Sequence, residues 1–310
     1  MRIAVIGAGG VGGYYAAQLA RHGHEVVLLA RGEHLNAIRR DGLRITTPDE
    51  SFAVAIDARD DIASAEVELA IVAVKHYSLD SVGPITAALA RRGALVLPLL
   101  NGVDAADRLE SLGVPRAQIM GGLTYVSAFR TSPGTIVRRS SFQRVLVGEL
   151  QGGGSQRVQD VVGALLRAGI EAECVEDVRA DLWRKLMFLA AMAAACGLAR
   201  RPIGPLREET MGRRLIQRAV GEVAAVARAA GVGIAPEEEA LTLHALDSVP
   251  YDMKPSFLVD VERGGLNELE ALSGTVARLG EAFGVPTLVH DTVVAAFARN
   301  GGTARMKRHV

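Results

Sequence analysis

A glycine-rich turn near the start of the chain constrains the fold more than any other feature. Met1–Ile6 reads as a short buried strand of the parallel-sheet type, and it runs directly into Gly7–Gly12, which has the spacing GxGxxG. A helix-like stretch, Tyr14–Arg21, and a second apolar strand, Glu25–Ala30, follow. Strand, glycine turn, helix and strand in this order make a short motif a specific prediction of dinucleotide binding.

The three glycines of the motif have different expected tasks. Gly7 permits the tight turn, Gly9 lets the backbone approach a pyrophosphate, and Gly12 allows the helix to pack closely on the strand. Backbone N–H groups at the start of the helix then hold the phosphate. The expected cofactor-binding residues of this turn are Gly7, Ala8, Gly9, Gly10, Val11 and Gly12.

The residue after the second strand bears on which nicotinamide cofactor is bound. NAD-specific sites usually carry an acidic residue about 20 residues after the glycines, where it binds the ribose 2′-hydroxyl. This chain has Arg31 there, and a planar, permanently charged guanidinium suits a phosphate. The pattern therefore favours NADPH over NADH. In the alternative interpretation, Arg31 is an ordinary solvated arginine and Glu33 binds the ribose.

Composition bounds the size of the fold and excludes some partners. The 310 residues suffice for two domains with separate cores. The 35 basic and 35 acidic residues cancel, so neither nucleic acid nor an anionic membrane surface is expected as a partner. Cys174 and Cys196 have neither disulfide nor metal spacing, and we expect two buried thiols in a reducing cytoplasm. No metal site is expected.

The ends of the chain and its most apolar run give no indication of a membrane. The first strand begins at Met1, which leaves no room for a signal peptide. Leu186–Ala199 is too short for a membrane span and is expected to be a core helix. The basic stretch Arg305–His309 is interpreted as a solvated tail. A cytoplasmic protein is expected.

The pattern of elements changes about halfway along the chain. Strand and helix signals alternate at first and long helical patterns follow, which predicts an α/β Rossmann-type dinucleotide-binding domain over residues 1–175 and an all-α C-terminal domain over residues 176–310. Further strands are expected at 43–46, 52–56, 69–74, 94–100, 121–129, 134–138 and 144–148. Further helices are expected at 33–40, 157–168, 177–198, 206–230, 236–246, 254–263, 266–283 and 287–299.

Lys185 is the candidate for proton chemistry in the helical half. Its neighbours at helical spacing, such as Leu182, Phe188 and Leu189, are mostly apolar. Helix geometry alone leaves two interpretations open. The ammonium can extend along the apolar surface to reach solvent, or it can be partly desolvated beside the cofactor, with a lowered pKa that suits proton transfer.

In the order and spacing of its motifs the chain resembles the ketopantoate reductase (2-dehydropantoate 2-reductase) family, over nearly its whole length. The resemblance rests on Gly7–Gly12, Arg31, Lys75, Asn101-Gly102, Trp183-Arg-Lys185-Leu, Ser256-Phe-Leu-x-Asp260-x-x-x-Gly264-x-x-x-Glu268 and Gly274. It implies an oxidoreductase that uses NADP(H) to reduce a small-molecule 2-oxo acid, with 2-dehydropantoate as the family's substrate in pantothenate biosynthesis.

The resemblance implies a role for each matched residue. Lys185 matches the general acid that protonates the ketone oxygen, and Glu268 matches a glutamate near the cofactor and that lysine. Ser256 matches the hydroxyl that binds the substrate carboxylate, Asn101 the amide between nicotinamide ribose and substrate, and Lys75 a cation on the cofactor side. Taken alone, these last four would be a carboxylate at a helix start, a helix cap, a turn and an ordinary strand-end lysine.

The chain departs from the family at the substrate pocket. Family asparagines that hold the hydroxyl and carboxylate groups of ketopantoate are replaced here by Leu189, Ala193, Ile203 and Met253. Buried polar contacts of this kind each contribute on the order of 1 kcal/mol. The resemblance therefore implies a more apolar pocket and a bulkier or less polar 2-oxo acid or ketone.

Two other functions fit part of the pattern. An opine-type dehydrogenase, which reduces an imine, relies on a His–Asp pair; the adjacent His290 and Asp291 do not share a helix face, and no other pair stands out in the sequence. A redox sensor that binds NADPH without turnover would not need both Lys185 and Glu268. The oligomeric state stays open, with a homodimer among the expected partners.

Overall fold

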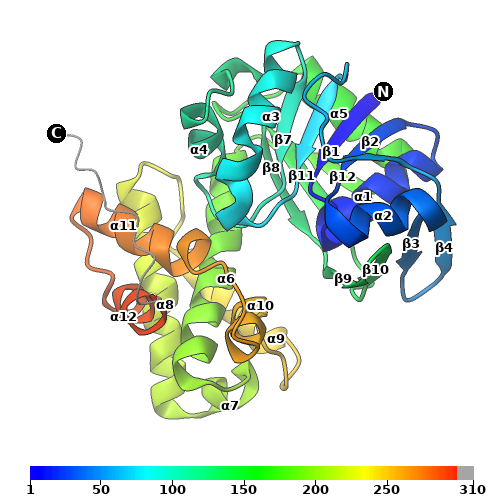
Figure 1. The fold of residues 1–310 in the computed structure, drawn as a ribbon. Coiled ribbons are helices and arrows are strands. Elements are labelled where there is room, and N and C mark those ends of the chain that lie inside the picture. The colour runs from blue at the N-terminus through cyan, green and yellow to red at the C-terminus, as the bar shows by residue number, and fades with distance from the viewer. Residues whose placement is uncertain (299–310) are drawn as a thin grey trace. The chain divides into compact units, whose positions relative to one another are not determined.

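The structure, a computed structural model, describes residues 1–298 and contains two compact units. The first unit is Met1–Leu182, and the second begins at Trp183. Figure 1 shows the strands gathered in the first unit and only helices in the described part of the second. The fold class expected from the sequence is confirmed.

A five-stranded parallel sheet organises the first unit. Its order is β5-β2-β1-β6-β7, and every neighbouring pair is parallel. The strands are β1 (Arg2–Ile6), β2 (Glu25–Leu29), β5 (Asp57–Arg59), β6 (Leu69–Val72) and β7 (Leu95–Pro98). The helices around it are α1 (Gly10–Arg21), α2 (Gly32–Asp41), α3 (Leu79–Arg91), α4 (Ala105–Ser111) and α5 (Gln156–Arg167). The sequence analysis had not identified β5, α3 or α4.

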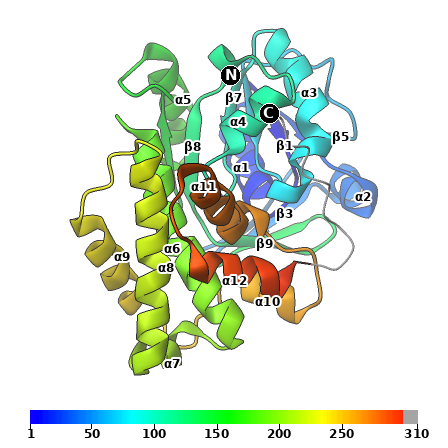
Figure 2. The same cartoon turned by 90° about the vertical axis from the view of Figure 1, so that its left-hand side faces the viewer.

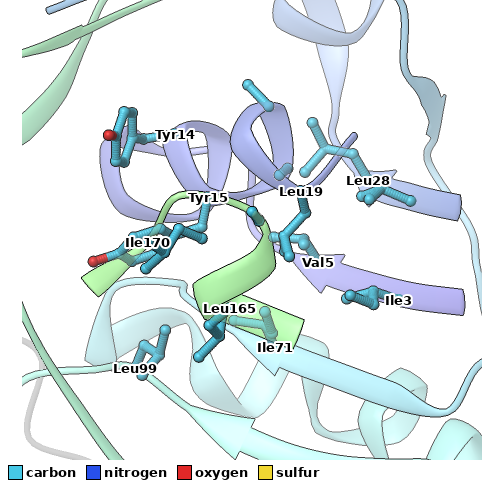
Figure 3. Packing of buried hydrophobic residues seen from close by; sticks show 14 of the residues in the cluster. Ile3, Val5, Tyr14, Tyr15, Leu19, Leu28, Ile71, Leu99, Leu165 and Ile170 are labelled. Carbon is cyan, nitrogen blue, oxygen red and sulfur yellow. The ribbon is translucent and has the colours of Figure 1, made fainter. Parts of the chain in front are cut away.

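The central strand β1 is buried on both faces from Ile3 to Ile6, which explains the apolar run of these residues. Ile3 and Val5 face a core shared with α1 and α5, whereas Ala4 and Ile6 face a second core shared with α3 and α4. Figure 3 shows the first of these cores, with Val5 beside Leu19 of α1. Helices on both faces are the arrangement expected of a doubly wound dinucleotide-binding sheet.

Two smaller sheets complete the first unit. One has the order β4-β3-β10-β9 and the other β12-β11-β8. Their strands are β3 (Leu43–Thr46), β4 (Ser51–Val54), β8 (Gly121–Tyr125), β9 (Ala128–Ser132), β10 (Thr135–Arg138), β11 (Arg144–Gly148) and β12 (Glu171–Cys174). The single strand expected over residues 121–129 is wrong. The chain leaves one sheet after Tyr125 and joins the other at Ala128, and the N–H of Ser127 in between bonds to the Ser140 hydroxyl.

The expectation that both cysteines are buried is also wrong. Cys196 is buried in a helix, where burial raises the pKa of its thiol to about 12. Cys174 is exposed at the end of β12. Because β12 is the edge strand of its sheet and most of its side chains are exposed, it lacks the apolar pattern from which sequence analysis recognises a strand.

The second unit is built from helices around a long apolar one. The helices are α6 (Val178–Ala199), which begins in the first unit, α7 (Ile203–Glu208), α8 (Thr210–Ala229), α9 (Glu237–Ser248), α10 (Ser256–Glu262), the π-helical turn η3 (Glu270–Gly274), α11 (Thr275–Phe283) and α12 (Leu288–Phe297). Helices α11 and α12 pack against α8 (Figure 2). The basic tail at 305–309 and the end of the last expected helix lie outside the described residues.

One helix expected in the second unit is two helices in the structure. The helix expected over residues 206–230 is interrupted at Glu209, whose backbone is extended. Helix α8 then starts so close to α7 that a Cβ on Gly212 would lie 2.3 Å from the Leu206 carbonyl oxygen.

Helix α6 has 22 residues, so by length and composition alone it could cross a membrane. In the fold, 61% of its most apolar window is buried, as in a core helix.

Candidate active site

The glycine turn connects β1 to α1 and has the geometry that the motif predicts. Gly7 adopts a φ of +111°, a conformation that side chains disfavour. A Cβ on Gly12 would lie 2.0 Å from the Gly7 carbonyl oxygen, so only glycine lets α1 approach the turn. A Cβ on Gly9, in contrast, would have no neighbour within 4 Å.

The space beside Gly9 is open, as the phosphate-binding role expected of this turn requires. Gly9 is the N-cap of α1, and no other atom fills the space where a side chain at this position would lie. The first-turn N–H groups of a helix have no partner within that helix, and the first turn of α1 contains no acidic residue that would repel an anion. The backbone donors and the space for an anion therefore occur together.

A buried histidine that the sequence analysis missed braces this turn. His34 on α2 lies with its Nε2 2.8 Å from the Ala8 carbonyl oxygen, while its Nδ1 accepts a hydrogen bond of 2.8 Å from the Gly134 N–H. These two bonds place the ring proton on Nε2, and burial lowers the pKa of His34, which keeps the ring neutral. No short motif signals this contact, because the partners are far apart in the chain.

Arg31 is exposed at the N-cap of α2, two residues after the end of β2. Glu33 is also exposed, in the first turn of the same helix. Since β1 and β2 are adjacent and parallel, both side chains belong to the edge of the sheet that carries the glycine turn. Position therefore does not distinguish Arg31 from Glu33 as the residue that meets the ribose. The two side chains differ in the sign of their charge.

Two further predicted residues follow the next strands at the same edge. Lys75 is exposed after β6, and Asn101 is half-buried after β7. Gly102, with a φ of +100°, bends the backbone there. Because β6 pairs with β1 and β7 pairs with β6, all in parallel, the structure brings these residues and the glycine turn to one edge of the sheet.

The structure contains a His–Asp pair that the sequence analysis did not find. His76 follows Lys75, and its Nε2 lies 3.0 Å from Oδ1 of Asp104. The Arg108 guanidinium donates to Nδ1 of the same ring at 3.0 Å and to Asp80 at 2.6 Å. The imidazole is only 3% exposed and both of its nitrogens are engaged, so it links the loops after β6 and β7 rather than offering a proton to a substrate.

In the second unit, Lys185 lies half-buried on α6 beside Trp183, which is buried. Burial lowers the pKa of the Lys185 ammonium to about 8, and the negative charge of Glu268 partly opposes this change. The neighbouring Arg184 donates to Glu238 at 2.9 Å. Of the two interpretations of Lys185, the structure supports the desolvated one.

Glu268 is a buried carboxylate, 6% exposed, in the segment that precedes the π-helical turn η3. The expected helix over residues 266–283 is wrong at its start, because the chain becomes helical only at Glu270. The backbone N–H of Leu269 bonds to the Asn267 side chain at 3.1 Å, and this local bond holds the segment outside the helix. The negative charge of Glu268 therefore acts on the Lys185 ammonium from a loop rather than from a helix.

Ser256 is the exposed first residue of α10. The N-cap is Pro255 and no side chain caps this helix, so the capping role considered for Ser256 is not observed. The adjacent Phe257 is buried, and its ring lies where a Cβ on Gly197 would be 2.8 Å away. This contact holds the start of α10 against the last turns of α6.

The four apolar replacements occur in two groups within the second unit. Leu189 and Ala193 follow Lys185 along α6 at spacings of four, so they share its helix face. Ile203, fully buried at the start of α7, donates its N–H to the Met253 carbonyl oxygen at 3.1 Å.

The adjacent His290 and Asp291 have different partners. The Asp291 carboxylate accepts a hydrogen bond from the Thr287 hydroxyl, whereas the buried His290 ring lies against the Ala219 carbonyl oxygen.

Comparison with known proteins matches both halves of the chain to one family. The profile of the family described as ketopantoate reductase PanE/ApbA matches residues 3–152, and the profile of its C-terminal part matches residues 177–300. A 2-dehydropantoate 2-reductase of Halobacterium salinarum is 33% identical over 281 residues, which cover 89% of this chain and 91% of that protein. YkpB of Bacillus subtilis, an uncharacterized oxidoreductase, is 29% identical over 297 residues, or 95% and 97% of the two chains.

Solved structures share the fold over almost the whole chain. A PanE/ApbA family ketopantoate reductase from Ralstonia eutropha superposes with a TM-score of 0.85 at 29% identity, covering 96% of this chain and 97% of the other. D-mandelate dehydrogenase, crystallised with NADH and anilino(oxo)acetate, has a TM-score of 0.84 at 23% identity and covers 95% and 96%. At that identity the second likeness concerns the fold alone.

The glycine turn yields a paired test. Gly12→Ala should destabilise the protein by about 1–3 kcal/mol, the usual cost of overpacking, because its Cβ would meet the Gly7 carbonyl. Gly9→Ala should leave the free energy of unfolding within about 0.5 kcal/mol, since its φ of −75° suits alanine and its surroundings are open. Urea denaturation measures both values.

The same pair should separate stability from binding. The methyl group of Gly9→Ala would occupy the space proposed for the phosphate, so dinucleotide affinity should fall by about tenfold or more, equivalent to about 1.4 kcal/mol. Titration of each purified variant with the dinucleotide measures this. Wild-type affinity in Gly9→Ala would show that the open space is not where the phosphate binds.

Proposed function

Because the chain belongs to the ketopantoate reductase PanE/ApbA family, we propose that it uses NADPH to reduce a 2-oxo acid to a 2-hydroxy acid. The family consists of oxidoreductases that act on a CH–OH group and bind a nicotinamide dinucleotide. The observation that carries the proposal is Lys185, a desolvated ammonium whose pKa is lowered to about 8 and which a buried glutamate helps to keep charged.

Reduction of a ketone needs a hydride at carbon and a proton at oxygen. The nicotinamide, when bound, supplies the hydride. In our proposal the Lys185 ammonium gives its proton to the carbonyl oxygen as hydride adds to the carbon and the C=O π bond breaks, which leaves a 2-hydroxy acid, a neutral amine and the oxidised nicotinamide. A pKa of about 8 suits this task, because the group is still protonated at neutral pH and releases its proton more readily than an ordinary lysine. Glu268 keeps the ammonium charged until the transfer.

The remaining predicted residues divide between cofactor and substrate. We propose that the backbone of Gly7–Gly12 holds the pyrophosphate and that Lys75 and Asn101 act at the same sheet edge, Asn101 contacting both cofactor and substrate. Ser256, exposed at the start of α10, would bind the substrate carboxylate. Residues 1–175 then form the NADP-binding domain and residues 176–310 the substrate and catalytic domain.

Charge favours NADPH over NADH. Arg31 is an exposed cation at the end of β2, where a 2′-phosphate needs one, and a guanidinium binds phosphate in a bidentate manner. An exposed carboxylate such as Glu33 would repel that phosphate if it alone bound the ribose. We therefore assign the 2′-phosphate to Arg31.

The apolar positions favour a substrate with an apolar side chain over 2-dehydropantoate. Leu189 and Ala193 share the helix face of Lys185, and neither can bond to a substrate hydroxyl. D-mandelate dehydrogenase, which has this fold, was crystallised with anilino(oxo)acetate, so the fold can hold a 2-oxo acid with a large apolar group. 2-Dehydropantoate, the named substrate of several relatives, is the second candidate.

Two rival functions have less support. An opine-type dehydrogenase would need an accessible His–Asp pair, whereas His76 and Asp104 are bonded to each other and to Arg108 with the imidazole buried. A redox sensor without turnover would have no use for a desolvated lysine. We further propose that the enzyme is a cytoplasmic homodimer that acts on a small molecule and not on nucleic acid or a membrane.

Arg31 should determine the choice of cofactor. Arg31→Ala should weaken NADPH binding by about 5- to 150-fold, or about 1–3 kcal/mol for a charge-assisted bond, and leave NADH binding nearly unchanged. Fluorescence titration with both cofactors measures the effect, with Glu33→Gln as the matched control. Equal losses of affinity for NADPH and NADH in Arg31→Ala would contradict the assignment of the 2′-phosphate to Arg31.

Lys185 should set the pH dependence of reduction. Because the acid must be protonated, kcat/KM for reduction should fall as pH rises through about 8. Glu268→Gln removes the charge that raises this pKa, so the fall should begin at lower pH. Lys185→Met should lower kcat by about 10²- to 10⁴-fold with NADPH affinity unchanged.

Glu238→Gln is the control for this series, because Glu238 pairs with the neighbouring Arg184. It should leave the midpoint of the pH profile where it is. A Lys185→Met variant with more than about a third of wild-type kcat would rule out lysine as the acid.

The substrate preference can be tested with a single hydroxyl. Compared with 2-dehydropantoate, the analogue without the terminal hydroxyl should have a kcat/KM about 5- to 150-fold higher, because a hydroxyl buried against leucine loses water and gains no partner. Leu189→Asn should narrow this gap and Leu189→Ala should not. A clearly higher kcat/KM of the wild type for 2-dehydropantoate than for the analogue would instead identify 2-dehydropantoate as the substrate.

A further inference from the structure

The helix that follows Glu268 starts with a turn of unusual geometry. In η3, the N–H of Gly274 donates to the Leu269 carbonyl oxygen at 2.9 Å, five residues back, which is the bond of a π-helix. The N–H of Leu272 bonds to the carbonyl oxygen of Glu268 itself at 3.2 Å. The backbone of the proposed catalytic glutamate is thus attached directly to the π-helical turn.

A wide turn of this kind needs side chains to hold it. The Thr275 hydroxyl donates to the Glu270 carbonyl oxygen at 2.8 Å, across the length of the π-helical turn. The Ser273 hydroxyl, buried at 1% exposure, lies 3.0 Å from Nδ1 of His290 on α12. Nε2 of the same ring lies 3.1 Å from the Ala219 carbonyl oxygen on α8.

These partners determine where the protons are. A carbonyl oxygen can only accept, so Nε2 of His290 carries the ring proton and Nδ1 accepts from the Ser273 hydroxyl. His290 is fully buried, and burial lowers its pKa to about 4, so the ring is neutral at ordinary pH and its acceptor stays available. The Glu222 carboxylate on α8 accepts the Val289 N–H at 2.9 Å and so holds the start of α12 in place.

A serine next to a histidine can also be a nucleophile, but burial argues against that here. Both side chains are within 1% of full burial, and the second ring nitrogen is occupied by the Ala219 carbonyl. No substrate can reach the hydroxyl without unfolding of the turn. The pair therefore acts on the protein itself.

We propose that Ser273 and His290 are positioning residues for Glu268, which hold the π-helical turn and thereby aim the Glu268 carboxylate at Lys185. In an α-helix each residue turns the chain by about 100°. If the extra residue of the π turn were lost, everything before it would rotate by about that angle, and Glu268 would point away from the ammonium. This inference rests on the roles of Lys185 and Glu268 in the proposed function.

Direct titration of Lys185 tests the inference without turnover. The chain has only four lysines, Lys75, Lys185, Lys254 and Lys307, so ¹³Cε signals of labelled lysine are few, and Lys185→Arg assigns the one that matters. In the wild type this signal should titrate near pH 8. Ser273→Ala should lower its midpoint by up to about one pH unit, the size expected when one charge of such a pair moves by about 2 Å.

Three further variants complete the experiment. Glu268→Gln should lower the midpoint, and Ser273→Ala combined with Glu268→Gln should lower it no further, because both changes remove the same interaction. Thr275→Val should act like Ser273→Ala if the serine variant folds poorly. Thr292→Ala, which removes an exposed hydroxyl of α12 bonded to Leu288, is the matched control and should leave the midpoint unchanged.

The outcomes separate this inference from the proposed function. If Ser273→Ala and Thr275→Val lower thermal stability but leave the Lys185 midpoint at the wild-type value while Glu268→Gln lowers it, the pair is merely structural and the inference is overturned. A normal titration series with no loss of kcat in Lys185→Met would overturn the proposed function instead and leave the positioning role standing.

Discussion

The electrostatic interaction between a desolvated ammonium and a buried carboxylate is the feature on which the proposed chemistry depends. Burial alone would drive Lys185 toward its neutral form, and Glu268 opposes this. Together these two effects keep the Lys185 ammonium charged at neutral pH but make it a stronger acid than an ordinary lysine. In the proposed reduction one lysine needs this property, and the second unit supplies both Lys185 and Glu268.

A second constraint acts in the first unit, where backbone must come close to backbone. Gly12 packs against the Gly7 carbonyl, and Gly9 leaves space for an anion. Buried histidines brace both sides of this sheet edge: His34 bonds to the turn itself, and His76 links the loops after β6 and β7. In both cases a buried imidazole, hydrogen-bonded through both ring nitrogens, joins segments that are far apart in the sequence.

The sequence predicts what depends on local pattern and fails where the structure depends on distant partners. The glycine turn, β1 and α6 follow from motif and hydropathy, and the structure agrees with them. The pairs His76–Asp104 and Ser273–His290 leave no such signal, because their members are 28 and 17 residues apart. The late helical start after Glu268 is equally hidden, since Asn267 and Thr275 decide it through side-chain bonds to backbone. The exposure of Cys174 is also not predicted, because it lies on the edge strand β12, which has no apolar pattern that identifies it as a strand.

The central claim is that this protein transfers hydride from NADPH to the carbonyl carbon of a 2-oxo acid. Incubation with NADPH deuterated at the transferred position of C4 and an apolar 2-oxo acid, followed by mass spectrometry of the product, tests it most directly. The account predicts a 2-hydroxy acid with one deuterium at C2, formed without any added amino acid. NADPH binding with no labelled product across a panel of 2-oxo acids, or a labelled product only when an amine is supplied, would contradict it.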